Sequence, residues 1–325
     1  MDKSVKETRK RVLFLIQVVI SIILFYTIFN HINLNQVRNV AEDMKIGYFL
    51  LALLIKLSSI LFSTAMLGVI IEILQLFVPY KELLKIYFSS FFYNSLGVGT
   101  IGGDLYRWYK LQKINGSNDA SSLIIMTEKI IIFSVLLSFA FVGLLIAALN
   151  GSYIMLFLLI PLPFVFVWGL SQVFQNFFHF LGKFKTLKKW YPFDFFSTHL
   201  GKFPQTPPEK LAKAILFSSL FYIVNIIAFA FIVYSVDPTI PISVSMIIVP
   251  VVILFTSLPI TFQGFGLREI TVAYLFPALG YSSVTGAIVA ILYLFANLAI
   301  AGLSGLYTVS HKIKLRSDAT PTDER

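Results

Sequence analysis

The chain has 325 residues, of which 57% are hydrophobic and 13% charged, and it carries a formal net charge of +10. Soluble globular domains carry about 25% charged residues, so this composition excludes a water-soluble fold and leaves no room for a soluble catalytic domain. The basic residues fall in short segments beside apolar runs rather than on one polar face, which argues against a nucleic-acid partner. Because the sequence has no cysteine, disulfides, iron–sulfur clusters and thiolate zinc sites are excluded.

Apolar runs of roughly 20 residues, long enough to cross a bilayer as helices, recur along the chain. The predicted spans are 12–29, 48–74, 121–149, 153–174, 211–236 and 283–309. The first run follows a basic N-terminus without a small-residue cleavage site, so we expect a retained helix rather than a signal peptide. The predicted fold is therefore an all-α polytopic membrane protein.

Two further apolar regions, 83–109 and 242–279, are interrupted by Gly, Pro and charged residues and are predicted to be broken or re-entrant. Cytoplasmic loops are enriched in Lys and Arg, which places the N-terminus, the loop 175–210 and the C-terminus on the cytoplasmic side of the cell membrane. This orientation holds if both interrupted regions return to the side they entered from, dipping in from opposite sides. Opposed breaks are typical of inverted-repeat transporters, although two ordinary kinked helix pairs, giving eight crossings, fit the same charges.

We expect one integral membrane domain over residues 1–314, with a first half of about 1–150 and a second half of about 175–314. The loop 175–210 interleaves aromatic residues with lysines, which is typical of a segment lying on the membrane; docking of anionic headgroups is the alternative. The polar tail 315–325 is predicted to be disordered.

The first interrupted region has four glycines in the seven residues from Gly97 to Gly103. Its spacing formally matches G-x-G-x-x-G, but no strand precedes it, so a dinucleotide site is rejected. Such a segment disfavours regular helix and frees backbone groups that must face protein, water or ligand inside a membrane. Asp104 and Arg107 follow on one predicted helix face, within reach of each other. Ionisable residues here are functional candidates, and an arginine extending to cytoplasmic phosphates is the plain alternative.

The second interrupted region contains Pro259, Gly264 and Gly266, followed directly by Arg268 and Glu269. Pro259 removes a helical donor and the glycines loosen the chain, so the helix is again broken beside charge. Arg268 offers a planar donor fork suited to phosphate, and Glu269 could balance its charge or carry a proton. As neighbours on a helix the two side chains point about 100° apart, so they need not pair.

Among the other charges inside predicted spans, Glu128 is the third candidate, whereas Lys56 and Glu72 are interpreted as snorkelling or packing residues. No metal-ligand cluster, catalytic triad or P-loop is visible, so we expect neither catalytic residues nor a metal or cofactor, and a transporter rather than an enzyme. The predicted substrate-binding residues are Asn94, Gly99, Gly102, Gly103, Asp104, Arg107, Glu128, Pro259, Gly264, Gly266, Arg268 and Glu269.

Both interrupted regions resemble signatures of the lysylphosphatidylglycerol synthase transmembrane family, also described as flippase-like integral membrane proteins of bacteria and archaea. Asn94, Val98-Gly99-Thr100-Ile101-Gly102-Gly103-Asp104 and Arg107 are similar to the first signature, and 258–269 is similar to the second. Val98 and Gln263 depart from the usual Pro and Gly, and Glu128-Lys129 stands where Glu-Arg is common. Some members carry a soluble aminoacyl transferase or glycosyltransferase, and we expect this chain to be the membrane module alone.

The resemblance implies a lipid flippase or transporter that moves a phosphate-bearing lipid between leaflets. Arg107 and Arg268 would bind the phosphate, while Asp104, Glu128 and Glu269 would supply counter-charge or recognise a cationic substituent. Expected partners are membrane lipids, either anionic phospholipid or polyprenyl-linked sugar, and a separate lipid-modifying enzyme; the chain could also form an oligomer. The alternatives are a membrane-embedded transferase or accessory subunit of a glycolipid or aminoacyl-lipid pathway, and a structural partner without turnover.

Overall fold

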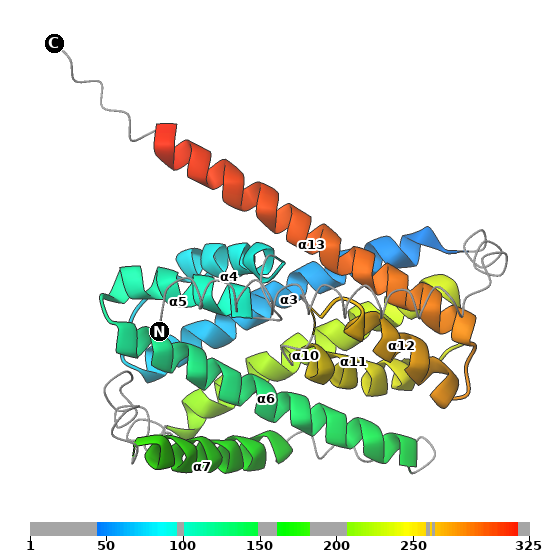
Figure 1. The fold of residues 1–325 in the computed structure, drawn as a ribbon, viewed down its shortest axis with the longest axis horizontal. Helices are drawn as coiled ribbons and strands as arrows, with labels where there is room; N and C mark the ends of the chain where they lie inside the picture. Colours follow the sequence, from blue (N-terminus) through cyan, green and yellow to red (C-terminus); the bar gives the residue numbers. More distant parts are fainter. Residues whose placement is uncertain are drawn as a thin grey trace, which may run out of the picture. The chain divides into compact units, whose positions relative to one another are not determined.

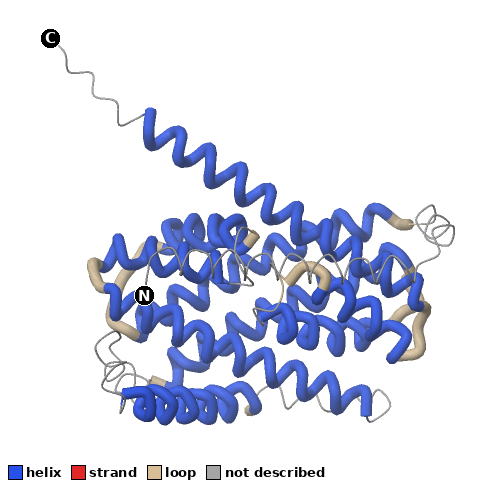
Figure 2. The backbone as a smooth tube through the Cα atoms, viewed as in Figure 1, coloured by secondary structure: helices blue, strands red, loops and turns tan. Residues whose placement is uncertain are grey.

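A computed structural model describes residues 44–95, 101–148, 161–182, 207–257, 261 and 264–317. These residues form nine α-helices and no strand (Figures 1 and 2). In chain order the helices are α3 (Ile46–Ile73), α4 (Tyr80–Asn94), α5 (Ile101–Asn115), α6 (Asn118–Ala148), α7 (Leu162–Gly182), α10 (Pro208–Val236), α11 (Ile242–Ser257), α12 (Leu267–Ala278) and α13 (Ser283–Ser317). The predicted all-α fold is confirmed.

Four of these helices, α3, α6, α10 and α13, are long and apolar enough to cross a membrane, so the chain is a multi-pass membrane protein. They coincide with four of the predicted spans. The predicted span 12–29 lies outside the described residues. The span predicted over 153–174 is described from Leu162 onward, where α7 continues to Gly182 and so extends into the predicted loop. In its last turns apolar residues recur at helical spacing with polar residues between them. A search for continuous apolar runs does not detect a helix of this kind.

Both predicted interruptions fall between short helices. The helices α4, α5, α11 and α12 have 15, 15, 16 and 12 residues. At 1.5 Å per residue they are about 18–24 Å long, too short to cross a hydrocarbon core of about 30 Å alone. Each pair is preceded by one long helix and followed by another, so the order long–short–short–long occurs twice, as α3 to α6 and as α10 to α13. This repeat of element lengths is not visible in the residues themselves.

The chain divides into two compact units that do not follow the predicted halves. Unit 1 contains residues 85–106 and 255–325, and therefore both interruptions. Unit 2 contains residues 43–84 and 107–254. Each unit thus contains segments from both series of helices, α3 to α6 and α10 to α13.

The core of unit 2 is the antiparallel pair of α3 and α10. At one end the backbone N–H of Lys45 donates to the carbonyl of Ser235 at 2.9 Å, and at the other the Lys210 ammonium donates to the carbonyl of Glu72 at 3.1 Å. The helix α6 packs beside them, and the Tyr222 hydroxyl of α10 donates to the carbonyl of Ile132 at 3.2 Å. In this interior apolar side chains exclude water and lipid from the buried polar groups.

The core of unit 1 is α13, which packs against α12 and against the second half of α4. The rings of Phe88 on α4 and Tyr307 on α13 meet edge to face, with 5.4 Å between centroids. The start of α12 is held to α13 by Arg268, whose guanidinium lies against Tyr293. One helix therefore carries contacts from both interrupted regions.

Candidate functional site

The first interruption is closed by Asn94, the last residue of α4. Its side-chain oxygen accepts a hydrogen bond of 2.8 Å from the backbone N–H of Gly103, in the first turn of α5. First-turn N–H groups have no partner within their own helix, so Asn94 acts as a cap supplied from another helix. A Cβ at Gly103 would overlap the Asn94 amide and would lie 2.6 Å from the carbonyl oxygen of Ser90. Only glycine allows this close approach.

Asp104 is half buried in the first turn of α5, where the helix dipole favours a negative charge. Nearby, the rings of Tyr93 on α4 and Tyr106 on α5 stack with 4.2 Å between centroids and 13° between planes. This contact fixes α4 to α5 a second time. Gly102 is half buried in the same turn, and Gly99 lies outside the described residues.

Arg107 pairs with Glu128 on the next helix. The distance from Arg107 Nη2 to Glu128 Oε2 is 3.2 Å, and the two side chains are 4% and 0% exposed. Both residues lie roughly three helical turns from Gly116 (φ +70°), where α5 turns back into α6, so the hairpin places them opposite each other. In the same hairpin the Trp108 indole N–H donates to the Ser122 hydroxyl at 2.9 Å.

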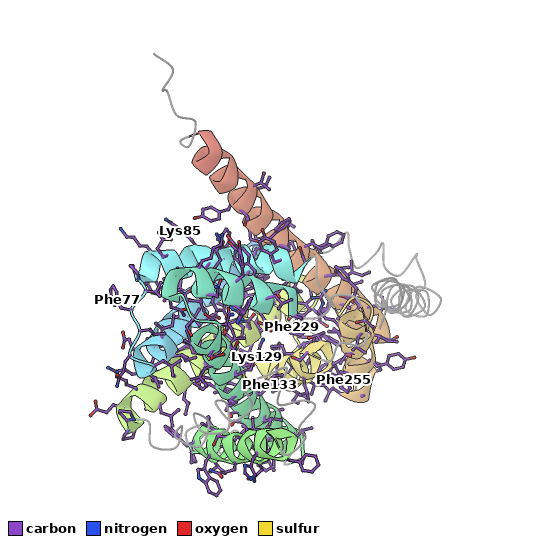
Figure 3. All side chains as sticks on the ribbon, turned by 60° about the vertical axis from the view of Figure 1, so that its left-hand side comes forward. Phe77, Lys85, Lys129, Phe133, Phe229 and Phe255 are labelled. Carbon is purple, nitrogen blue, oxygen red and sulfur yellow. The ribbon has the colours of Figure 1, made fainter. Side chains whose placement is uncertain are left out.

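This pairing changes what Arg107 can do. Its guanidinium is enclosed by protein, so in this conformation a headgroup does not reach it. A buried ion pair contributes little net stability, but removing one partner leaves an uncompensated charge and is strongly destabilising. Lys129, the next residue on α6, is only half buried and shares a helix face with Phe133 (Figure 3). Of this dipeptide, Glu128 is the residue that lies 3.2 Å from Arg107.

The second interruption turns into α12 through two glycines with positive φ, Gly264 (+72°) and Gly266 (+79°). A Cβ at Gly264 would also lie 3.0 Å from the methyl group of Thr256. Glu269, the third residue of α12, bends back, and its Oε2 accepts the Gly266 N–H at 2.7 Å. This is the carboxylate half of a capping box. Pro259 lies outside the described residues.

Arg268 and Glu269 pair, although adjacent helix positions point apart. Arg268 Nε donates to Glu269 Oε1 at 2.9 Å, because the carboxylate turns toward the helix start and meets the base of the guanidinium. The guanidinium carbon lies 5.7 Å from the ring centroids of both Phe265 and Tyr293. Such cation–π contacts hold the plane of the guanidinium in place.

The Arg268 side chain is 12% exposed, whereas the side chain of Glu269 is 1% exposed. Since only Nε is used by the carboxylate, the Nη groups keep the donor fork that binds phosphate or carboxylate through two parallel hydrogen bonds. Arg268 can therefore hold an anion without breaking its bond to Glu269. Of the two candidate arginines, Arg268 is the more exposed.

The predicted residues therefore separate into two groups. Unit 1 holds Asn94, Gly102, Gly103, Asp104, Gly264, Gly266, Arg268 and Glu269, and unit 2 holds Arg107 and Glu128. Lys56, interpreted as a snorkelling or packing residue, is 7% exposed and its ammonium donates to Asn225 at 3.3 Å, so it packs inside the protein. Glu72 is exposed at the end of α3.

Sequence reasoning missed Tyr293 and Asn225. Both are polar-tipped residues inside long apolar spans, which is a weak signal that could have drawn attention to them. Within the described ranges no group of three His, Asp or Glu residues could hold a metal ion.

Four helices long and apolar enough to span a membrane define a polytopic helical membrane protein. The chain belongs to the family described as Lysylphosphatidylglycerol synthase TM region, whose model matches residues 14–305. The resemblance found in the two signatures is thereby confirmed, and the family indicates a membrane protein of lipid biosynthesis or lipid flipping. A search of curated proteins found no match.

Proposed function

We propose that the protein moves a phosphate-bearing lipid between the leaflets of the cell membrane, with Arg268 as the residue that binds the headgroup. The proposal rests on the environment of Arg268, which follows a helix interruption. Its guanidinium contacts the carboxylate of Glu269 and lies near the rings of Phe265 and Tyr293, and its side chain is 12% exposed. A charge inside a bilayer costs at least about 2.5 kcal/mol, so its retention there favours a functional role.

Phosphate is the ligand chemistry that this arrangement supports best. The Arg268 guanidinium, held near the rings of Phe265 and Tyr293, has planar donors that match the paired oxygens of a phosphodiester or pyrophosphate. The backbone beside it is irregular at Gly264 and Gly266, and irregular backbone in a membrane is tolerated where it lines a cavity or meets a ligand. The substrate is therefore a phospholipid or a lipid-linked saccharide.

The two pairs of short helices are the parts that would form the path. In this proposal α4–α5 enters the membrane from the cytoplasmic side and α11–α12 from the outside, with both termini in the cytoplasm. Their meeting point would be polar because the first turn of α5 contains Asp104 and the first turn of α12 contains Arg268 and Glu269. The enclosed pair of Arg107 and Glu128 would hold the α5–α6 hairpin in position rather than touch the headgroup.

The test is translocation in proteoliposomes, using headgroup-labelled phospholipid and, separately, labelled lipid-linked sugar. Wild type should move one class, and Arg268→Ala should not, while Lys113→Ala, which removes an exposed cation near the end of α5, should behave as wild type. If purified protein moves neither lipid but chemically alters one in detergent, where no two sides exist, the transferase alternative replaces the proposal. If it does neither, an accessory or structural role is left.

A further inference from the structure

A second buried polar group lies between α3 and α10, away from both interruptions in the sequence. Lys56 and Asn225 are each 7% exposed, and the Lys56 ammonium donates to the Asn225 side-chain oxygen at 3.3 Å. At 1.5 Å per residue, Lys56 lies about 15 Å from Ile46, the first residue of α3. Lys56 therefore lies in the interior of this apolar helix, well away from both of its ends.

Contacts along the whole length of the pair define one register. Lys45 meets Ser235 at one end, Lys56 meets Asn225 near the middle, and Glu72 meets Lys210 at the other end. From one contact to the next, the number of residues advanced along α3 equals the number moved back along α10 to within one residue. Seven residues beyond Lys56, this register places Ser63 opposite Ser218.

Other buried polar residues near the middle of this interface are serines, whose side chains are small. Ser59 and Ser63 are buried, and their hydroxyls donate to carbonyls of their own helix, Lys56 and Ser59 respectively. The buried Ser218 hydroxyl has no hydrogen-bond partner among the described residues. Small residues let membrane helices approach closely, but they pack similarly after a shift of one turn. Such serines do not define a single register.

Lys56 does distinguish the registers. A shift of one turn would place Phe221 or Phe229 opposite the ammonium in place of Asn225, so the hydrogen bond between Lys56 and Asn225 would be lost. Buried polar residues in helix interfaces are best known for selecting one register at a cost in stability. We propose that Lys56 is a positioning residue that, with Asn225, fixes the register of α3 against α10. This role does not depend on the lipid translocation proposed above.

A thermal double-mutant cycle tests the pair. Asn225→Leu should lower the midpoint of unfolding in detergent strongly, because it leaves the ammonium buried without this acceptor. Lys56→Met should lower it little or raise it, and the double variant should recover much of the loss caused by Asn225→Leu. Additive effects of the two substitutions would overturn the pairing.

Cross-linking tests the register itself, and the absence of native cysteine gives a clean background. Ser63→Cys with Ser218→Cys should form a disulfide at least about fivefold faster than Ser63→Cys with Ala214→Cys, since one turn adds about 5 Å to a bond that requires a Cα separation below about 7 Å. In the Lys56→Met background this ratio should fall toward one, and Lys56→Arg should restore it. An unchanged ratio with Lys56→Met would overturn the proposal.

Discussion

Arg107 and Glu128 join the two helices of one hairpin through an ion pair of 3.2 Å that is almost completely shielded from solvent. The arginine belongs to the first signature and the glutamate to the following helix, and the turn at Gly116 brings them together. Their burial means that each charge is tolerated because of the other. Loss of either partner is therefore expected to destabilise the hairpin.

Glu128→Gln should destabilise the protein by about 3–5 kcal/mol, because it leaves the buried Arg107 guanidinium without its counter-charge. Thermal unfolding in detergent would measure the loss. Lys129→Gln is the matched control, since this neighbour is half buried, and it should change stability by less than about 1 kcal/mol. Equal effects of both substitutions would show that the pair is not the reason for the loss.

Gly103→Ala should separate the ends of α4 and α5. The new Cβ would lie 2.6 Å from the Ser90 carbonyl and would displace the Asn94 amide, so we expect a loss of about 1–3 kcal/mol. Gly47→Ala is the control, because nothing lies within 4 Å of that Cβ in α3, and it should be neutral or stabilising by up to about 1 kcal/mol. A neutral Gly103→Ala would contradict the observed contact.

Gly266→Ala should strain the start of α12. Alanine at a φ of +79° costs about 1–2 kcal/mol, and the Gly266 N–H bond to Glu269 would be disturbed with it. Gly302→Ala, in the middle of α13 with no atom within 4 Å of its Cβ, should cost nothing. Comparing the two unfolding midpoints checks this, and a Gly266→Ala variant as stable as Gly302→Ala would argue against the turn.

Glu269→Gln should alter lipid binding more than folding. The amide oxygen can still accept the Gly266 N–H, but its NH2 group would then face Arg268 Nε, donor against donor. With its counter-charge gone, Arg268 should bind a phosphate-bearing lipid several-fold more tightly and release it more slowly. Lipid binding to protein in detergent and translocation in vesicles would separate the two effects. Weaker binding together with unchanged translocation would contradict this role.

The sequence predicted what depends on chain-local properties. The lengths of the apolar runs predicted α3, α6, α10 and α13. The clustered glycines and Pro259 predicted the two interruptions. The partners of the charged residues could not be predicted, because they depend on which helices fold against each other. Glu128 lies 21 positions after Arg107, and only the turn at Gly116 brings the two side chains within 3.2 Å of each other.

The capping contact of Asn94 could not be predicted for the same reason. Its position beside the glycines predicts a ligand contact, which stays a prediction, and the structure adds that its side-chain oxygen caps α5 through Gly103. Tyr293 gives only a weak local signal, because its contact with Arg268 arises where α12 lies against α13. Contacts of this kind are recognised from how the helices pack in the structure, and not from the spacing of residues along the sequence.

The central claim is that Arg268 binds the phosphate of a lipid as it crosses the membrane. The most direct measurement is the rate at which headgroup-labelled lipid becomes inaccessible to an external quencher, for wild type, Arg268→Ala and Lys113→Ala at equal amounts of folded protein. The account predicts that Arg268→Ala falls to the rate of protein-free vesicles while Lys113→Ala keeps the wild-type rate. Translocation by Arg268→Ala at the wild-type rate would contradict it.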